Sequence, residues 1–301
     1  MIPYIQVPPL TLFGYQLIQP FGVMVVLAVT FGAWMVRRRA AEEGYDDDEM
    51  VTALYWCVGT AFVTSHVFEI VFYQTHKLLE EGPLTLLKVW DGLSSMGGFL
   101  GAFLGLAYYY GVRRKQGWLA PAEFIMQGLA FGWIFGRMGC SIVHDHPGHF
   151  TDFFLGVRYP DGVRHDLGLY ELMFTALVLF PATLLLHRFK PPRGSYIALV
   201  CMLYGPARFG MDFLRIAGKS GDTRYFGLTA GHYGSLAIAA VGVGFAIYAL
   251  LHRDQRYGQG LAAVAATAAA SSGGKANGNT ANGGNTPGKP PGKKRRRRGK
   301  A

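Results

Sequence analysis

Seven long apolar runs constrain the fold of this chain more than any other feature of its sequence. About 20 residues at a helical rise of about 1.5 Å span the roughly 30 Å hydrocarbon core of a bilayer. Because helices satisfy their own backbone hydrogen bonds in lipid, such runs predict membrane-spanning helices. The runs are 18–36, 52–73, 92–110, 123–142, 167–187, 195–213 and 228–251. The sequence therefore predicts an all-α fold, a polytopic bundle of seven transmembrane helices.

The formal net charge of +10 belongs to the end of the chain. Residues 252–301 contain eleven Lys and Arg but one acid, so the preceding residues balance at 18 basic against 18 acidic. Because residues 1–251 carry equal numbers of basic and acidic residues, their charge gives no reason to expect nucleic acid as a partner. We expect a membrane domain over 1–257 and a disordered basic tail over 258–301, which is poor in large apolar residues. The tail's KKRRRR cluster is suited to an anionic membrane surface, or is simply solvated.

The distribution of Lys and Arg predicts the orientation of the bundle. One predicted face carries 20 basic residues, among them 37–39, 113–115 and the tail, whereas the other carries seven. Cytoplasmic loops of membrane proteins are enriched in these residues. The N-terminus is therefore expected outside and the C-terminus in the cytoplasm.

Small residues recur every four positions in the third and fourth predicted spans. The first series is Gly97, Gly101 and Gly105, and the second is Gly128, Gly132 and Gly136. This spacing places the glycines on one helix face and predicts close approach of neighbouring helix backbones.

Six ionisable residues lie inside the predicted spans, where such side chains are costly and are functional candidates by default. They are His66, Glu69, Arg137, Glu171, Arg208 and Asp212. Arg137 follows Glu123 by 14 residues and Arg208 follows Ser195 by 13, so both lie about 20 Å above the cytoplasmic helix ends. We expect all six to gather in the outer half of the bilayer.

Two interpretations of this group remain open. The charges could pair to hold the bundle together, since Tyr204, Arg208 and Asp212 follow one helix face at i, i+4 and i+8. Alternatively, Arg137 and Arg208 form a pocket for an anionic phospholipid headgroup, because guanidinium donors match phosphate oxygens. We favour the phosphate pocket.

The stretch HDHPGH at 144–149 is the richest source of metal ligands. His144, Asp145, His146 and His149 offer ligand types that suit zinc, but their spacing matches no strong zinc signature. The sequence favours a histidine-rich rim of the pocket without metal, in which one histidine accepts a proton near neutral pH.

Four stretches resemble, in order and spacing, the prolipoprotein diacylglyceryl transferases. They are KVWDGLSSMGGFLGA (88–102), GRMGCSIVHDHPG (136–148), RHDLGLYE (164–171) and YGPARFGMDFLR (204–215), within a similarity that covers residues 18–251. The resemblance implies a multi-pass enzyme of the bacterial inner membrane that requires no cofactor. It would transfer a diacylglyceryl group from phosphatidylglycerol to the lipobox cysteine of lipoprotein precursors.

The resemblance also implies roles for individual residues. Arg137 and Arg208 would hold the phosphate, with His165 as the third catalytic residue, and Tyr204 would position the headgroup. The remaining expected substrate-binding residues are Glu171, Gly97, Gly98, Asp145, Gly148, His144 and His66.

The chain departs from the family pattern where protons are handled. Met96 stands where a histidine usually precedes the paired glycines, and Cys140 and Asp145 replace an asparagine and a glutamate. His165, His144 and His66, in that order, are the histidines expected to act as the base instead. The alternative is a non-catalytic paralogue that binds or moves anionic phospholipid. Cys140 itself is expected to be a small packing residue and not a nucleophile.

Overall fold

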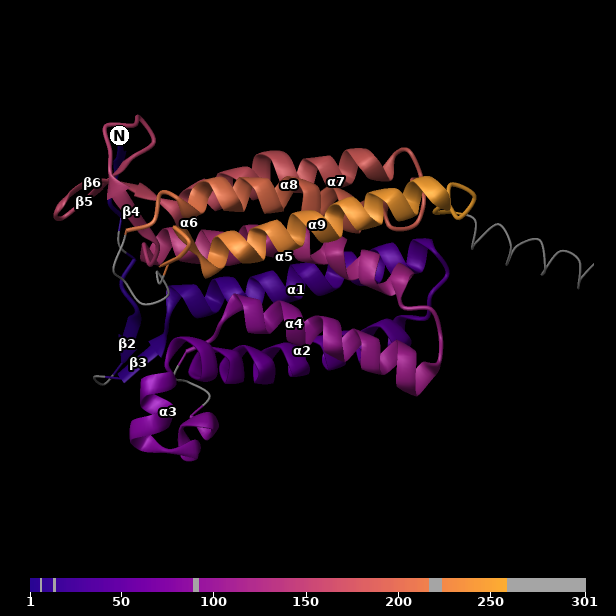
Figure 1. The fold of residues 1–301 in the computed structure, drawn as a ribbon, viewed down its shortest axis with the longest axis horizontal. Coiled ribbons are helices and arrows are strands. Elements are labelled where there is room, and N and C mark those ends of the chain that lie inside the picture. Colours follow the sequence, from indigo (N-terminus) through magenta and orange to yellow (C-terminus); the bar gives the residue numbers. More distant parts are fainter. Residues whose placement is uncertain (6, 13–14, 89–91, 217–223, 259–301) are drawn as a thin grey trace, which may run out of the picture. The chain divides into compact units, whose positions relative to one another are not determined.

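The computed structural model describes residues 1–5, 7–12, 15–88, 92–216 and 224–258. These residues are mostly helical, and the long helices run side by side along the longest axis of the molecule (Figure 1). The α-helices are α1 Pro20–Glu42, α2 Asp47–Phe68, α3 Thr75–Glu81, α4 Ser95–Ala107, α5 Leu119–Val143, α6 Leu167–Phe174, α7 Phe180–His187, α8 Ser195–Asp212 and α9 Ala230–Leu251. The predicted tail, apart from its first residue, Gly258, lies outside the described residues.

Three of these helices continue through a π-helical turn, and a short 3₁₀ helix precedes α4. The turns are η1 Glu69–Tyr73 after α2, η3 Tyr108–Arg114 after α4 and η4 Thr175–Leu179 between α6 and α7, and the 3₁₀ helix is η2 Pro83–Leu87. Pro181 follows η4, and because proline has no N–H it removes a helical hydrogen bond at that point. Through this turn, α6, η4 and α7 form one continuous apolar segment, Leu167–His187.

All seven apolar runs contain a helix in the structure. Among the described helices, five are long and apolar enough to cross a membrane: Pro20–Glu42, Asp47–Phe72, Leu119–Val143, Leu167–His187 and Ala230–Leu251. The other two runs contain α4, which has 13 residues, and α8, which has 18 residues and carries Arg208 and Asp212. The structure thus gives a helical membrane protein, whereas the full count of seven spans stays a prediction.

The glycines of α4 and α5 allow neighbouring helices to approach as predicted. α4 packs on α2, and a Cβ atom built on Gly101 would lie 2.5 Å from the carbonyl oxygen of Thr60. α5 packs on α1 in the same way, with Gly132 against the carbonyl of Ala28. Thr60 and Thr64 also donate hydrogen bonds to the Gly101 and Gly97 carbonyls, at 2.7 and 2.8 Å. Gly136 differs, because a Cβ atom built on it would have nothing within 4 Å.

Replacing Gly101 by alanine should destabilise the bundle. The added methyl group meets backbone atoms of α2, and overpacking of this kind costs about 1–3 kcal/mol of unfolding free energy. Gly136→Ala is the matched control, because the same change meets open space and gains helix propensity of up to about 1 kcal/mol. Thermal unfolding in detergent checks both variants. Equal midpoints for Gly101→Ala and the unmodified protein would contradict the close packing of α2 and α4.

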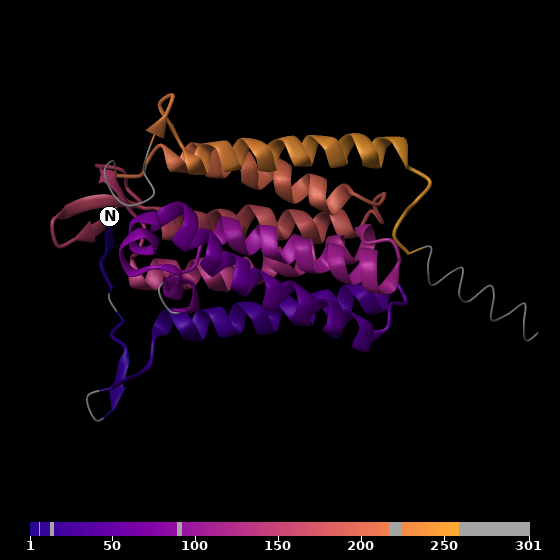
Figure 2. The ribbon, with the colours of Figure 1, turned by 60° about the horizontal axis from the view of Figure 1, so that its bottom comes forward.

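Short strands lie at one end of the bundle, a feature that the all-α prediction did not include. They are β1 Ile2–Pro3, β2 Leu10–Leu12, β3 Tyr15–Ile18, β4 Pro147–Phe150, β5 Val157–Tyr159, β6 Gly162–Asp166, β7 Arg224–Tyr225 and β8 Leu228–Thr229. The largest sheet has the order β1-β5-β6-β4, and the β2–β3 hairpin projects beside α1 (Figure 2). The strands have two to five residues, too few for a periodic signal in the sequence.

A backbone bridge connects the sheet to the residues that follow α8. Gly148 of β4 pairs with Arg215, three residues beyond the end of α8, and the His149 N–H donates to the Leu214 carbonyl at 2.9 Å. A Cβ on Gly148 would lie 2.5 Å from that same carbonyl oxygen, so only glycine fits here without displacement. This contact fixes the loop after α5 against the end of α8.

The opposite end of α5 is fastened by a buried carboxylate. Glu123 accepts hydrogen bonds from the Tyr196 N–H at 2.8 Å and from the Tyr257 hydroxyl at 2.5 Å. Its side chain therefore joins α5 to the start of α8 and to the segment after α9.

Candidate functional site

Two arginines from different helices share one buried carboxylate. Arg137 of α5 and Arg208 of α8 place guanidinium nitrogens 3.0 and 3.7 Å from Oε2 of Glu171, a fully buried residue of α6. The Tyr204 hydroxyl donates to Oε1 of the same carboxylate at 2.5 Å. Arg137 also lies over the ring of Trp133, with its guanidinium carbon 4.7 Å from the ring centroid. Glu171 therefore sets the direction of both arginines.

A second buried carboxylate, Asp212, supports the same group from the end of α8. Its oxygens lie 3.3 Å from Arg208 Nη2 and 3.7 Å from Arg215 Nη1. On its other side Asp212 accepts a hydrogen bond from the hydroxyl of Thr229, the residue that caps α9, and lies 3.3 Å from His232. The start of α9 is thereby tied to the arginine cluster.

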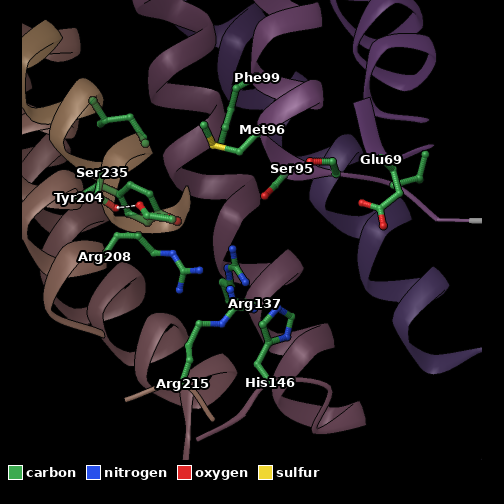
Figure 3. A pocket seen from close by; sticks show the side chains of 15 residues that line it. Glu69, Ser95, Met96, Phe99, Arg137, His146, Tyr204, Arg208, Arg215 and Ser235 are labelled. Carbon is green, nitrogen blue, oxygen red and sulfur yellow. Dashed lines mark hydrogen bonds between the residues drawn. The ribbon is translucent and has the colours of Figure 1, made fainter. Parts of the chain in front are cut away.

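A polar cavity of about 290 Å³ lies in front of these arginines. Arg137, Arg208 and Arg215 converge on it with His146, whereas Met96, Phe99, Ser95 and Glu69 line other parts of its wall (Figure 3). Among the described residues, these three guanidinium groups contact two carboxylates, Glu171 and Asp212, and the carboxylate of Glu69 lines another part of the same cavity. The guanidinium donors that line the cavity suit an anionic ligand such as a phosphodiester.

A larger apolar groove of about 780 Å³ lies beside the polar cavity. It is lined mainly by aliphatic and small side chains of α1, α2 and α5, including Val25, Val29 and Gly132. The groove and the cavity meet at four residues that line both spaces, Leu93, Ser95, Arg137 and His146. A ligand with a charged head and apolar chains would fit across this junction.

Several residues expected at the site support it from behind without lining either space. Glu171 contacts the arginines, as described above, and Gly97 packs against the backbone of α2 at Thr64 and Ser65. Gly98 follows without reaching the cavity wall, and His66 is buried with its Nδ1 3.1 Å from the Gly92 carbonyl. His66 therefore fixes the segment before α4.

Three residues of the loop after α5 that were expected at the site take different positions relative to the cavity and the groove. His144 has a left-handed backbone with φ of 53°, and its Nδ1 lies 2.5 Å from Asp166 while its ring stacks on Tyr4. It therefore ends the helix and turns away from both spaces. Asp145 lines the groove, and Gly148 makes the backbone bridge to Arg215.

His165, the histidine ranked first as the base, lies on β6 and lines neither space. Its Nδ1 is 2.9 Å from the Tyr170 hydroxyl. Partial burial, and secondarily the charge of His149, hold the pKa of His165 below its usual 6.5. The imidazole is therefore neutral at pH 7.

A titration should find the pKa of His165 below 6.5 in the intact protein. Between that value and 6.5 the unfolded chain binds a proton that the folded chain does not, so His165 lowers stability as the pH falls through this window. His149→Ala removes one cause of the shift and should move the midpoint upward. Histidine NMR in detergent checks both values. A midpoint at or above 6.5 in the unmodified protein would contradict the described surroundings.

The structure adds residues that sequence reasoning did not place at the site. Arg215 follows Arg208 by seven residues, two helical turns, which was the available signal for a shared face. Ser235 and Gly234 of α9 also line the cavity, and no charge or motif marked them. Met96 and Phe99 line the wall next to Gly97 and Gly98.

The fold and these two spaces define a class of protein. An apolar helical bundle with a cationic cavity beside an apolar groove is suited to handling an anionic lipid. The family profile of prolipoprotein diacylglyceryl transferase matches residues 9–248, and the chain belongs to this family.

Named relatives are similar over most of their length. The chain is 28% identical over 238 residues to a phosphatidylglycerol–prolipoprotein diacylglyceryl transferase of Actinobacillus pleuropneumoniae, covering 76% of this chain and 88% of that protein. It is 30% identical over 217 residues to the enzyme of that name from Vibrio parahaemolyticus, covering 69% and 78%. The one from Nitratidesulfovibrio vulgaris (strain Miyazaki F) is 28% identical over 274 residues, covering 87% and 100%.

Proposed function

We propose that this protein is a phosphatidylglycerol–prolipoprotein diacylglyceryl transferase of the bacterial inner membrane. The sulfur of a lipobox cysteine forms a bond to the diacylglyceryl carbon that carries the phosphate. The bond from that carbon to the phosphate oxygen breaks, and glycerol phosphate leaves with the electron pair. The family membership and the names of the relatives support this reaction.

The observation that carries the proposal is the meeting of the polar cavity and the apolar groove at Arg137. A phosphatidylglycerol molecule has one phosphodiester group, whose oxygens suit the guanidinium donors of Arg137, Arg208 and Arg215 in the cavity. Its two acyl chains suit the groove between α1, α2 and α5. The scissile bond would then lie where the two spaces join.

The arginines would act on the leaving group. Charge grows on the phosphate oxygens as the carbon–oxygen bond breaks, and fixed guanidinium donors stabilise that charge without reorganising. Arg137 and Arg208 are held by Glu171 before any substrate enters. Tyr204 and Glu69 line the same cavity, and in this proposal their side chains would contact the glycerol hydroxyls.

The proposed membrane arrangement has seven spans, with the N-terminus outside and the C-terminus in the cytoplasm. α4 with η3 and α8 supply the two spans beyond the five long apolar segments. The excess of Lys and Arg on one predicted face supports this orientation. The site then faces the outer half of the bilayer, where phospholipid and exported precursor meet.

A second function, binding or moving anionic phospholipid without transfer, is favoured by Met96. This thioether lines the cavity and cannot accept a proton. A protein of that kind would keep the arginine cluster and lose the reaction.

Purified full-length protein, phosphatidylglycerol and a lipobox-cysteine peptide decide between these functions. We expect glycerol phosphate release that depends on the peptide, and a peptide mass increased by one diacylglyceryl group. The matched peptide with serine in place of cysteine should give neither product. Lipid binding without release in the presence of the cysteine peptide would overturn the transferase proposal and support the binding protein.

A further inference from the structure

His146 lies at the junction of the polar cavity and the apolar groove. The left-handed residue His144 ends α5 and turns the chain, and His146 then lines both spaces. Figure 3 shows its imidazole directed into the cavity together with the arginines. Of the histidines whose side chains the structure describes, His146 is the one that lines these two spaces. A lipid that occupies both spaces would contact this ring.

The neighbouring carboxylate determines which nitrogen of the His146 ring carries a proton. Nδ1 of His146 contacts Oδ1 of Asp145, and a carboxylate oxygen in that position accepts a hydrogen bond from the ring N–H. Nδ1 is therefore the protonated nitrogen, and Nε2 keeps the lone pair that can accept a second proton. The charge of Asp145 also stabilises an imidazolium against repulsion from the arginines of the cavity.

The position of His146 matches the position of the reacting bond. In the proposed binding mode the phosphate lies in the cavity and the acyl chains lie in the groove, so the carbon between them lies where the two spaces meet. The sulfur of the substrate cysteine has to reach that carbon. His146 lines both spaces, whereas Met96 lines the cavity alone. A proton acceptor on His146 would therefore lie beside the approaching thiol.

The other groups that line the cavity are less suited to take the thiol proton. The thioether of Met96 cannot accept it. Glu69 lines another part of the wall and accepts a hydrogen bond from Gln74 Nε2 at 3.1 Å. A general base works best when its pKa lies near the working pH, and about 6.5 for an ordinary imidazole is nearer to neutrality than about 4 for an ordinary carboxylate.

We propose that His146 is the general base of the transfer and that Asp145 is its positioning residue. This inference rests on the proposed transferase function. Nε2 of His146 takes the proton of the substrate thiol, and the sulfur forms the bond to the diacylglyceryl carbon. The bond from that carbon to the phosphate oxygen breaks, and glycerol phosphate leaves with the electron pair. His146 then releases its proton to water, so the reaction needs no proton acceptor at Met96.

Variants of the full-length protein test the two roles. We expect His146→Gln to transfer about 10²- to 10⁴-fold more slowly, the usual effect of losing a general base. Asp145→Asn should lose less, because the base remains and only the carboxylate that orients it is gone. His149→Ala is the matched control, since it changes an exposed histidine of the same loop that lines neither space. Phosphatidylglycerol binding and gel filtration verify that every variant is folded.

A peptide with selenocysteine in place of the lipobox cysteine distinguishes a base from a structural residue. A selenol is a stronger acid than a thiol and is ionised at pH 7 without help, so it needs no base. The deficits of His146→Gln and Asp145→Asn relative to the unmodified protein should therefore shrink with this peptide. The deficit of Arg208→Ala should stay, because the leaving group is unchanged. Added imidazole should likewise restore part of the rate of His146→Ala and none of the rate of Arg208→Ala.

The outcomes separate this inference from the proposed function. Transfer to the cysteine peptide at the unmodified rate by His146→Gln would overturn the base and leave the transferase standing. A loss that neither selenocysteine nor imidazole relieves would also overturn the base, because it would show that His146 only supports the site. An unmodified rate in Asp145→Asn would overturn the positioning role. Absence of transfer by the unmodified protein would overturn the transferase, and the base with it.

Discussion

Replacing Arg208 by alanine should lower the rate of diacylglyceryl transfer by about 10²- to 10³-fold, the effect of removing one fixed donor to a developing oxyanion. Arg208 lines the polar cavity and is held from two sides by Glu171 and Asp212. Its loss removes one of three positive charges that face the phosphate position. The measurement is peptide-dependent glycerol phosphate release by the purified variant.

Two further variants make the Arg208 result interpretable. Arg208→Lys keeps the charge but loses the planar pair of donors, so we expect an intermediate rate. Arg158→Ala changes an exposed arginine of β5 that lines neither space, and it should transfer at the unmodified rate. Full activity in Arg208→Ala would contradict the assignment of the arginine cluster to the phosphate.

Glu171→Gln should destabilise the protein by about 3–5 kcal/mol, as expected when one partner of a buried ion pair is removed. The carboxylate is fully buried and contacts two arginines from different helices. Without its charge, Arg137 loses its carboxylate partner and Arg208 keeps Asp212, so the repulsion between the two guanidinium groups is less compensated. Thermal unfolding in detergent measures the loss of stability, and the transfer assay should show a lower rate in protein that is still folded.

Tyr204→Phe is the matched comparison for this variant. It removes one hydrogen bond to Glu171 and leaves the charge in place. A hydrogen bond to a charged group contributes about 1.5–3 kcal/mol, so Tyr204→Phe should destabilise less than Glu171→Gln. The reverse order would show that the ion pairs contribute little to stability.

The arginine cluster was the part of the site most accessible from sequence. Counting residues along two predicted helices placed Arg137 and Arg208 at one depth, and the structure brings both to one carboxylate. Helical rise is regular, so the depth of a residue in a span follows from its number. The rotation of each helix about its axis does not follow from residue numbers. His66 accordingly contacts the Gly92 carbonyl and does not reach the cavity.

The loop residues were the least accessible. His165 and His144 were expected at the pocket, but one lies on the outer sheet and the other turns toward Asp166. Gly148 is required by a backbone bridge to Arg215, which lies 67 positions later, just beyond the end of α8. Such contacts depend on where several loops meet in space. The spacing of residues within one loop does not predict that meeting point.

The sequence by itself determined that this chain forms apolar helices with tightly packed glycine faces and a pair of arginines at equal depth. These features follow from local periodicity and from the cost of charge in lipid. Only the tertiary structure decided that Arg215 joins the arginines and that His146 is the histidine of its loop that lines their cavity. It also decided that Cys140 lies near Asp145 and His146. The physical reason is that side chains brought together by a reversal of the chain share no periodic relation that a sequence could display.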